Sequence, residues 1–108
     1  MAAELRARVL DEAGTTVIEL TGDVDRDAEA ALDDAYARAG EAPALVLDFS
    51  RVSYINSTGI AVIVGLLARA RAKGQALSAR GLTEHYRQIF EITRLADFMT
   101  ILDEKEAA

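Results

Sequence analysis

The chain reads Ala-Leu-Val-Leu-Asp-Phe over residues 44–49, Ser-Arg-Val-Ser-Tyr-Ile-Asn-Ser-Thr-Gly over residues 50–59, and Ile-Ala-Val-Ile-Val-Gly over residues 60–65. The first segment predicts a strand from Ala44 to Phe49, and its uniformly apolar beginning favours a central strand covered on both faces. A loop should follow and end in Asn-Ser-Thr-Gly. Asn, Ser and Thr side chains accept hydrogen bonds from the unpaired amides of a first helical turn. We therefore expect a strand, a loop and an apolar helix in this order.

Turn residues and apolar spacing divide the rest of the chain into short elements. The further expected strands cover residues 5–10, 15–21, 75–80 and 98–102, the first two forming an antiparallel hairpin. The expected helices cover about residues 26–39, 57–73 and 83–92. Asp25 and Thr83 are the expected N-caps of the first and third helices, and an acidic tail follows the last strand. This order of elements predicts an α/β fold with a mixed sheet and crossover helices.

Composition restricts the class of protein. The 108 residues suit one domain, and 51% apolar with 28% charged residues is ordinary for a globular protein. Without cysteine the chain has no disulfide or thiolate metal site. No apolar run reaches membrane-spanning length, and residues 1–6 lack the pattern of a secretory signal, so we expect a cytoplasmic protein. The net charge of −6 disfavours nucleic acid as a direct partner, because phosphate binding rests mainly on Lys and Arg.

The second helix is apolar over most of its circumference. Every residue from Ile60 to Ala68 is apolar or glycine, so Ile60, Ile63, Val64 and Leu67 can face the sheet while other apolar residues lie round the side. The side residues are Ala61, Val62 and Leu66. Either neighbouring helices cover them, or they form a patch that binds a partner beside Ser57. Both alternatives follow from the pattern.

Ser57 is the candidate functional residue of the junction. It can be the N-cap of the helix, which the local sequence favours, or a spectator beside Asn56 as the cap. It can also accept a phosphoryl group, because the positive end of a helix dipole tolerates a phosphate. Thr58 is the rival acceptor, although its position inside the first turn favours a role in starting the helix.

Two motifs together point to a known family. The run Asp-Phe-Ser-x-Val-x-Tyr-Ile-Asn-Ser-Thr-Gly-Ile over residues 48–60 resembles the signature of the STAS domain, and Gly22-Asp23-Val24-Asp25 resembles the family's acidic turn. The resemblance covers nearly the whole chain. It implies a single STAS-like domain over residues 1–108, with a mixed four- to five-stranded sheet and three to four helices packed mainly on one face.

The chain looks most like the stand-alone anti-sigma-factor antagonists. The resemblance implies a protein that binds a kinase-type anti-sigma factor in a partner-switching circuit and is released when that partner phosphorylates Ser57. The expected partner-binding residues are Asp23, Asn56, Ser57, Thr58, Gly59, Ile60, Val62 and Leu66. Asn56 departs from the usual Asp of the motif, so phosphorylation is weakened or absent if that carboxylate matters. The alternative is a STAS subunit of a transporter or other signalling complex without a phospho-switch.

Enzymatic motifs are missing from the sequence. The residues around Ser57 lack the first glycine of a nucleophile elbow. Gly59 and Gly65 are not followed by Lys-Ser or Lys-Thr, so the chain has no P-loop motif there. A serine hydrolase would need His85, the sole histidine, as its base. One histidine and no cysteine make a transition-metal site improbable. We expect no enzyme, no cofactor and no metal, and the oligomeric state stays open.

Overall fold

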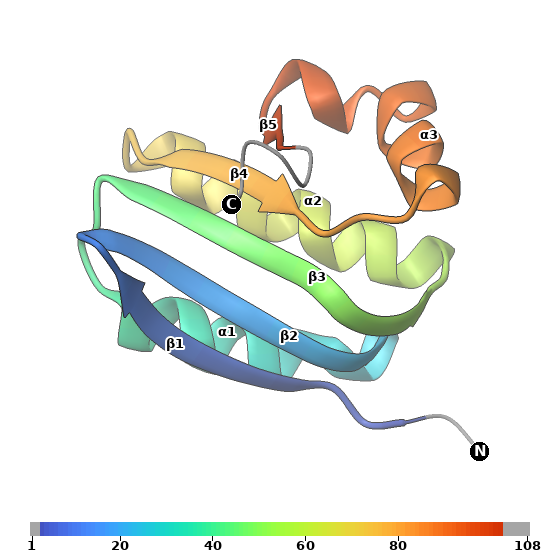
Figure 1. Ribbon diagram of the computed structural model, residues 1–108, viewed down its shortest axis with the longest axis horizontal. Helices are drawn as coiled ribbons and strands as arrows, with labels where there is room; N and C mark the ends of the chain where they lie inside the picture. The colour runs from blue at the N-terminus through green and yellow to red at the C-terminus, as the bar shows by residue number, and fades with distance from the viewer. Residues whose placement is uncertain (1–2, 103–108) are drawn as a thin grey trace.

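The computed structural model describes residues 3–102. After an initial hairpin, strands alternate with helical segments along the chain (Figure 1). The strands are β1 (Arg6–Glu12), β2 (Thr15–Val24), β3 (Ala44–Ile55), β4 (Ala76–Arg80) and β5 (Thr100–Ile101). The α-helices are α1 (Glu29–Ala39), α2 (Ser57–Ala72) and α3 (Glu84–Ile92), and the 3-10 turns are η1 (Arg26–Ala28) and η2 (Leu95–Asp97).

The five strands form one mixed sheet in the order β1-β2-β3-β4-β5. β1 and β2 are antiparallel, whereas β2, β3, β4 and β5 are parallel to one another. The hairpin turn places Ala13 and Gly14 at φ 53° and 87°, so two residues are enough to reverse the chain. Parallel neighbours need crossover connections, which the helical segments supply. The predicted mixed α/β sheet is confirmed.

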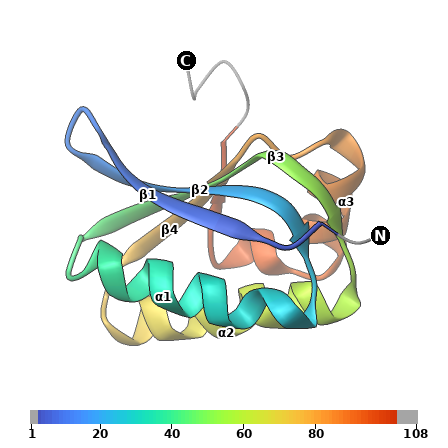
Figure 2. The ribbon, with the colours of Figure 1, turned by 90° about the horizontal axis from the view of Figure 1, so that it is seen from below.

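α1 and α2 lie side by side against one face of the sheet, and α3 lies near its end (Figure 2). From β3, Leu45, Leu47 and Phe49 belong to the buried core between the sheet and the helices. Phe90 of α3 meets Phe49 edge to face, with 5.7 Å between ring centroids. The core thus fixes α3 against the sheet through the same strand that leads to the start of α2.

Three predicted strand boundaries were wrong. β2 does not end at Thr21 but continues to Val24, so most of the segment of residues 22–25 is strand. β3 does not end at Phe49 but continues to Ile55, because the second half of the strand keeps pairing with β2 through Val24↔Ile55. Register shifts between Glu19 and Thr21 and between Gly22 and Asp23 accommodate this extension. The last strand is confined to Thr100–Ile101. The expected acidic tail lies outside the described residues.

The predicted helix caps hold with one adjustment. Asp25 Oδ1 accepts from the Asp27 amide at 3.0 Å, but it caps the 3-10 turn η1, and α1 begins only at Glu29. Thr83 caps α3 as predicted, with its hydroxyl accepting from the Tyr86 amide at 3.2 Å.

The circumference of α2 is divided between burial and exposure. Leu66 is 3% exposed beside α1, whereas Val64, which was expected to face the sheet, is 45% exposed. Of the three residues expected at the sides of this helix, Leu66 is covered, Val62 is partly buried and Ala61 is exposed. Binding of a partner by this side of the helix stays a prediction. Within residues 3–102, none of the helices combines the length and apolar character that crossing a membrane requires.

Candidate functional site

The start of α2 is organised by Asn56. This residue is extended (φ −103°, ψ −178°), and its Oδ1 accepts from the Gly59 amide at 2.8 Å and from the Thr58 hydroxyl at 2.9 Å. Ser57 is already the first helical residue. The N-cap role that the local sequence favoured for Ser57 therefore belongs to Asn56, because a cap must lie outside the helical backbone geometry.

The two hydroxyls of the first turn differ in their environment. The Thr58 hydroxyl is engaged with the Asn56 cap. Ser57 is exposed, and its hydroxyl makes no side-chain hydrogen bond with any described residue. Of the two hydroxyls, that of Ser57 is therefore the accessible one without a side-chain partner among the described residues, and it lies at the positive end of a 16-residue helix.

The junction between β3 and α2, formed by Asn56 to Gly59, packs closely against the end of β2. The Asn56 amide donates to the Val24 carbonyl at 3.2 Å. A Cβ added to Gly59 would lie 1.9 Å from the same carbonyl oxygen, so only glycine fits there. The segment of residues 22–25 at the end of β2 therefore lies beside the start of α2.

Three of the predicted contact residues lie below the surface. Gly59 is buried against Val24, and Leu66 packs in the core. Asp23 is 9% exposed, its Oδ2 accepts from the Ala3 amide at 3.0 Å, and its own amide donates to the Ala3 carbonyl at 2.9 Å. Each of the three contributes to the fold of the site, and their assignment as partner contacts stays a prediction.

The other predicted contacts are at least partly accessible and lie near the same end of α2. Ser57 and Thr58 are exposed, and Asn56, Ile60 and Val62 are partly buried. All five belong to the first half of α2 or its cap. This end of α2, with its cap, is the candidate functional site.

A polar cleft of about 230 Å³ adjoins the start of α2. Asp25, Arg26 and Asp27 line it from the β2–α1 connection, and Asn56 and Thr58 line it from α2. Sequence reasoning missed Arg26, the cation that faces this end of the helix. Its position directly after the segment of residues 22–25, which the family resemblance singled out, was the available indication. Within residues 3–102, no group of three or more His, Cys, Asp or Glu side chains is arranged to hold a metal ion.

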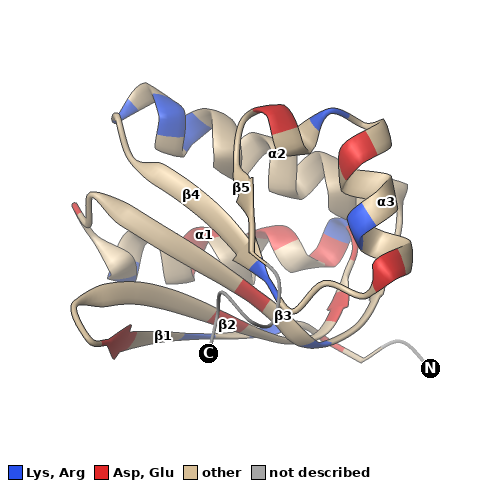
Figure 3. Cartoon of the chain, turned by 45° about the horizontal axis from the view of Figure 1, so that its top comes forward, with Lys and Arg blue, Asp and Glu red and all other residues tan. Residues whose placement is uncertain are grey.

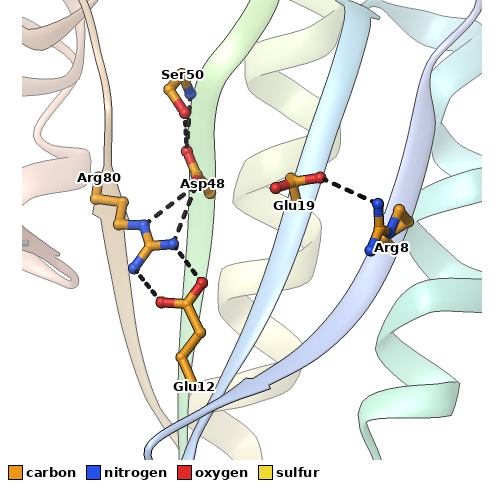
Figure 4. Close-up of polar contacts among 6 residues, drawn as sticks. All are labelled: Arg8, Glu12, Glu19, Asp48, Ser50 and Arg80. Carbon is orange, nitrogen blue, oxygen red and sulfur yellow. Dashed lines mark hydrogen bonds and ion pairs between the residues drawn. The ribbon is translucent and has the colours of Figure 1, made fainter.

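A second polar cluster lies on the sheet face opposite the helices (Figure 4). Arg80 donates to Asp48 Oδ2 at 3.1–3.2 Å and to both carboxylate oxygens of Glu12 at 2.9–3.0 Å. Both the amide and the hydroxyl of Ser50 donate to Asp48 Oδ1. Arg8 and Glu19 form a separate, longer ion pair at 4.0 Å.

The cluster shifts the pKa of each of its ionisable groups toward the charged form. Burial raises the pKa of Asp48, but the hydrogen bonds from Ser50 and Arg80 outweigh burial and leave it below its ordinary value. The hydrogen bond from Arg80 lowers the pKa of Glu12. The same contacts raise the pKa of Arg80, chiefly through its hydrogen bonds to Glu12. Glu12, Asp48 and Arg80 pair their charges and hydrogen bonds with one another, so the cluster links strands β1, β3 and β4. We call these three residues the staple.

The fold and the site together define an α/β domain in which an exposed serine, Ser57, is the first residue of a helix. A family model described as "Mlab, STAS domain" matches residues 8–103, and the chain belongs to the STAS domain family.

Known proteins agree with this assignment. The chain is 39% identical over 57 residues to the anti-sigma-B factor antagonist of Listeria monocytogenes, which covers 53% of this chain and 50% of that protein. The chain thus spans about half the length of the curated relatives it matches. Its fold matches an anti-sigma factor antagonist from Mycobacterium paratuberculosis, with a TM-score of 0.71, 25% identity and coverage of 94% and 89%. It also matches the unphosphorylated form of the anti-sigma factor antagonist SpoIIAA, with a TM-score of 0.70, 22% identity and coverage of 94% and 91%.

Proposed function

We propose that this protein is an anti-sigma-factor antagonist that acts in the cytoplasm. It binds a kinase-type anti-sigma factor through the surface around the start of α2, and phosphorylation of Ser57 releases it. The chain is then a ligand and a substrate of its partner, and catalysis belongs to the partner. Membership of the STAS family and the local similarity to anti-sigma-B factor antagonists support this role.

One observation carries the proposal. At the start of α2 the Thr58 hydroxyl is tied to the Asn56 cap, whereas the neighbouring Ser57 hydroxyl is exposed and makes no side-chain hydrogen bond with a described residue. A kinase that reaches this surface meets one free nucleophile. The Ser57 oxygen would form a bond to the γ-phosphorus of ATP, the bond to the ADP oxygen would break, and the serine proton would pass to a base of the kinase.

The consequence of phosphorylation follows from local charge. The phosphoryl group adds about −1.5 to −2 charges at neutral pH. The positive end of α2 can accommodate this charge, so the domain should stay folded. The partner surface should not accommodate it, because added bulk and charge enter a contact that fitted a bare hydroxyl. Asp25 and Asp27 line the adjoining cleft together with Arg26, so carboxylates outnumber the cation at this point.

Asn56 bears on the rate of phosphorylation. Its amide oxygen supplies both hydrogen bonds of the cap, so the geometry of Ser57 does not need a carboxylate at this position. A carboxylate at position 56 would be a stronger hydrogen-bond acceptor for the serine proton than the amide oxygen of Asn56 is. We therefore propose that Asn56 makes Ser57 a slower substrate than the Asp of the common motif would.

A binding titration tests the partner role and the switch together. The purified kinase-type anti-sigma factor is titrated with wild type, Ser57→Ala and Ser57→Asp. We expect wild type and Ser57→Ala to bind, and Ser57→Asp to bind at least about tenfold more weakly, because a buried unpaired charge opposes the contact. Equal binding by Ser57→Asp would remove the switch. Absence of wild-type binding would contradict the partner role.

Phosphate incorporation identifies the acceptor. The same anti-sigma factor is supplied with labelled ATP and with wild type, Ser57→Ala or Thr58→Ala. Label should enter wild type and Thr58→Ala but not Ser57→Ala. Incorporation that persists in Ser57→Ala would show that another residue is the acceptor.

A further inference from the structure

A shallow apolar groove lies beside the outer surface of α2, away from its start. Val64, Leu67, Ala68 and Arg71 of α2 line it on one side and Phe98 on the other, and its volume is about 360 Å³. Val64 is 45% exposed and Phe98 51% exposed. Large apolar side chains that are exposed together on a small domain mark an interaction surface.

The charge of the groove is opposite to that of the whole chain. The net charge of the protein is −6, yet Arg71 is the charged residue among those lining the groove. Its guanidinium lies over the Phe98 ring, 5.0 Å from the centroid. Arg69, by contrast, pairs with Asp33 at 2.9 Å, whereas Arg71 forms no ion pair with any residue in the described part of the chain. Figure 3 shows the basic residues gathered at this end of α2.

The groove continues the line on which Ser57 lies. Ser57, Val64 and Arg71 are exposed and follow one another at intervals of seven residues. Seven residues are about two turns and 10 Å of helix, so the three side chains form a row about 20 Å long on one side of α2. A straight helix packed along α2 would contact the whole row, with apolar residues at the same heptad spacing.

We propose that this groove binds an amphipathic helix of the anti-sigma factor. The apolar ridge of that helix packs on Val64 and Phe98, and one of its carboxylates pairs with Arg71. This inference rests on the proposed function and specifies the second half of its interface. Charge complementarity favours such a partner over a second copy of the chain, because a symmetric contact would bring two copies of Arg71 into one interface.

Paired variants test the groove. Wild type, Val64→Asp and Arg71→Glu are titrated against the same purified anti-sigma factor, with Ile92→Asp and Arg6→Glu as matched controls. Ile92 is an apolar residue that is 80% exposed on α3, and Arg6 is exposed on β1. We expect each groove variant to bind about tenfold or more weakly, and the controls to bind as wild type does. Thermal unfolding checks that all four variants stay folded.

Charge reversal identifies the pairing. A Glu→Lys or Asp→Lys change on the docking helix of the anti-sigma factor should restore binding of Arg71→Glu and weaken binding of wild type. Equal binding by wild type and both groove variants, with Ser57→Asp still defective, would overturn the groove proposal and leave the proposed function in place. Loss of all binding, wild type included, would overturn both. Sedimentation that shows a wild-type dimer dissociated by Val64→Asp would assign the groove to a second copy and overturn the proposal.

Discussion

Two surfaces of this domain differ in whether their polar side chains have partners within the fold. On the sheet face opposite the helices, Glu12, Asp48 and Arg80 are bonded to one another, with Ser50 completing the cluster. On the outer surface of α2, the Ser57 hydroxyl has no side-chain hydrogen bond with a described residue. Buried or half-buried polar groups that are fully satisfied stabilise a fold, whereas exposed groups left without partners are available to another molecule.

The staple and the outer surface of α2 should therefore contribute to different properties of the domain, the first to stability and the second to partner binding. β3 carries Asp48 on the stapled face and then runs on to the Asn56 cap, so the same strand serves both surfaces. Changes at the staple should alter the free energy of unfolding without altering partner binding. Changes on the outer surface of α2 should do the reverse. Substitutions at their junction should affect both, and they have the largest expected effect.

Gly59→Ala tests the junction. Alanine normally favours a helix over glycine by about 1 kcal/mol, but here the new methyl group would lie 1.9 Å from the Val24 carbonyl oxygen. Since the obstacle is backbone, the start of α2 must move, and we expect destabilisation of about 3 kcal/mol or more together with weaker partner binding. Denaturant unfolding measures the first effect, and the titration measures the second.

Gly65→Ala is the matched control for that change. It lies in the same helix, and a Cβ there meets no atom within 4 Å. We expect it to stabilise the domain by about 0.5–1 kcal/mol. Similar changes in the free energy of unfolding for Gly59→Ala and Gly65→Ala would mean that the Val24 carbonyl does not exclude a side chain at position 59.

Arg80→Met tests the staple. Asp48, which is 7% exposed, would lose its cation while keeping its hydrogen bonds from Ser50. We expect a loss of about 2 kcal/mol at pH 7 and no change in partner binding. Denaturant unfolding at several pH values is the measurement, with Arg8→Met as the control, because the Arg8–Glu19 pair is exposed on the Arg8 side and 4.0 Å long.

The pH dependence of that loss has a definite sign. The pKa values of Asp48 and Glu12 are lowered by folding. Their stabilisation is therefore fully present above the unfolded pKa of about 4 and disappears as the pH falls through the lower folded values. The difference between wild type and Arg80→Met should be largest near neutral pH and shrink in acid. A difference that stays constant down to acid pH would contradict an ionic staple.

Local sequence was sufficient for the elements but not for their contacts. The apolar run before Phe49 and the alternation of turns predicted the strands and helices in order, because these patterns depend on near neighbours. The length of β3 was missed, since its second half is held by pairing with β2. Arg80 and Glu12 are 68 residues apart, so no local pattern could have paired them.

The site was predicted in part for the same reason. Asn56, Ser57 and Thr58 are three consecutive candidates for one cap, and local sequence favoured the wrong one. The choice is made by Val24, whose carbonyl accepts from the Asn56 amide and excludes any side chain at Gly59. The apolar circumference of α2 did indicate an exposed patch, but Phe98, which completes the groove, comes from another part of the chain.

Asn56→Asp has the smallest expected effect on stability and is the sharpest test of the outer surface. Asp can keep both hydrogen bonds of the cap, and its charge interacts favourably with the positive end of α2, so the gain should be a few tenths of a kcal/mol. Asn56→Ala loses the cap and should cost about 1 kcal/mol. We expect the anti-sigma factor to phosphorylate Asn56→Asp faster than wild type at Ser57, as measured by initial rates of label incorporation. The two proteins should differ little in stability, so a difference in folding would not mask a difference in phosphorylation rate. Equal rates would therefore mean that the charge at position 56 has no part in the switch.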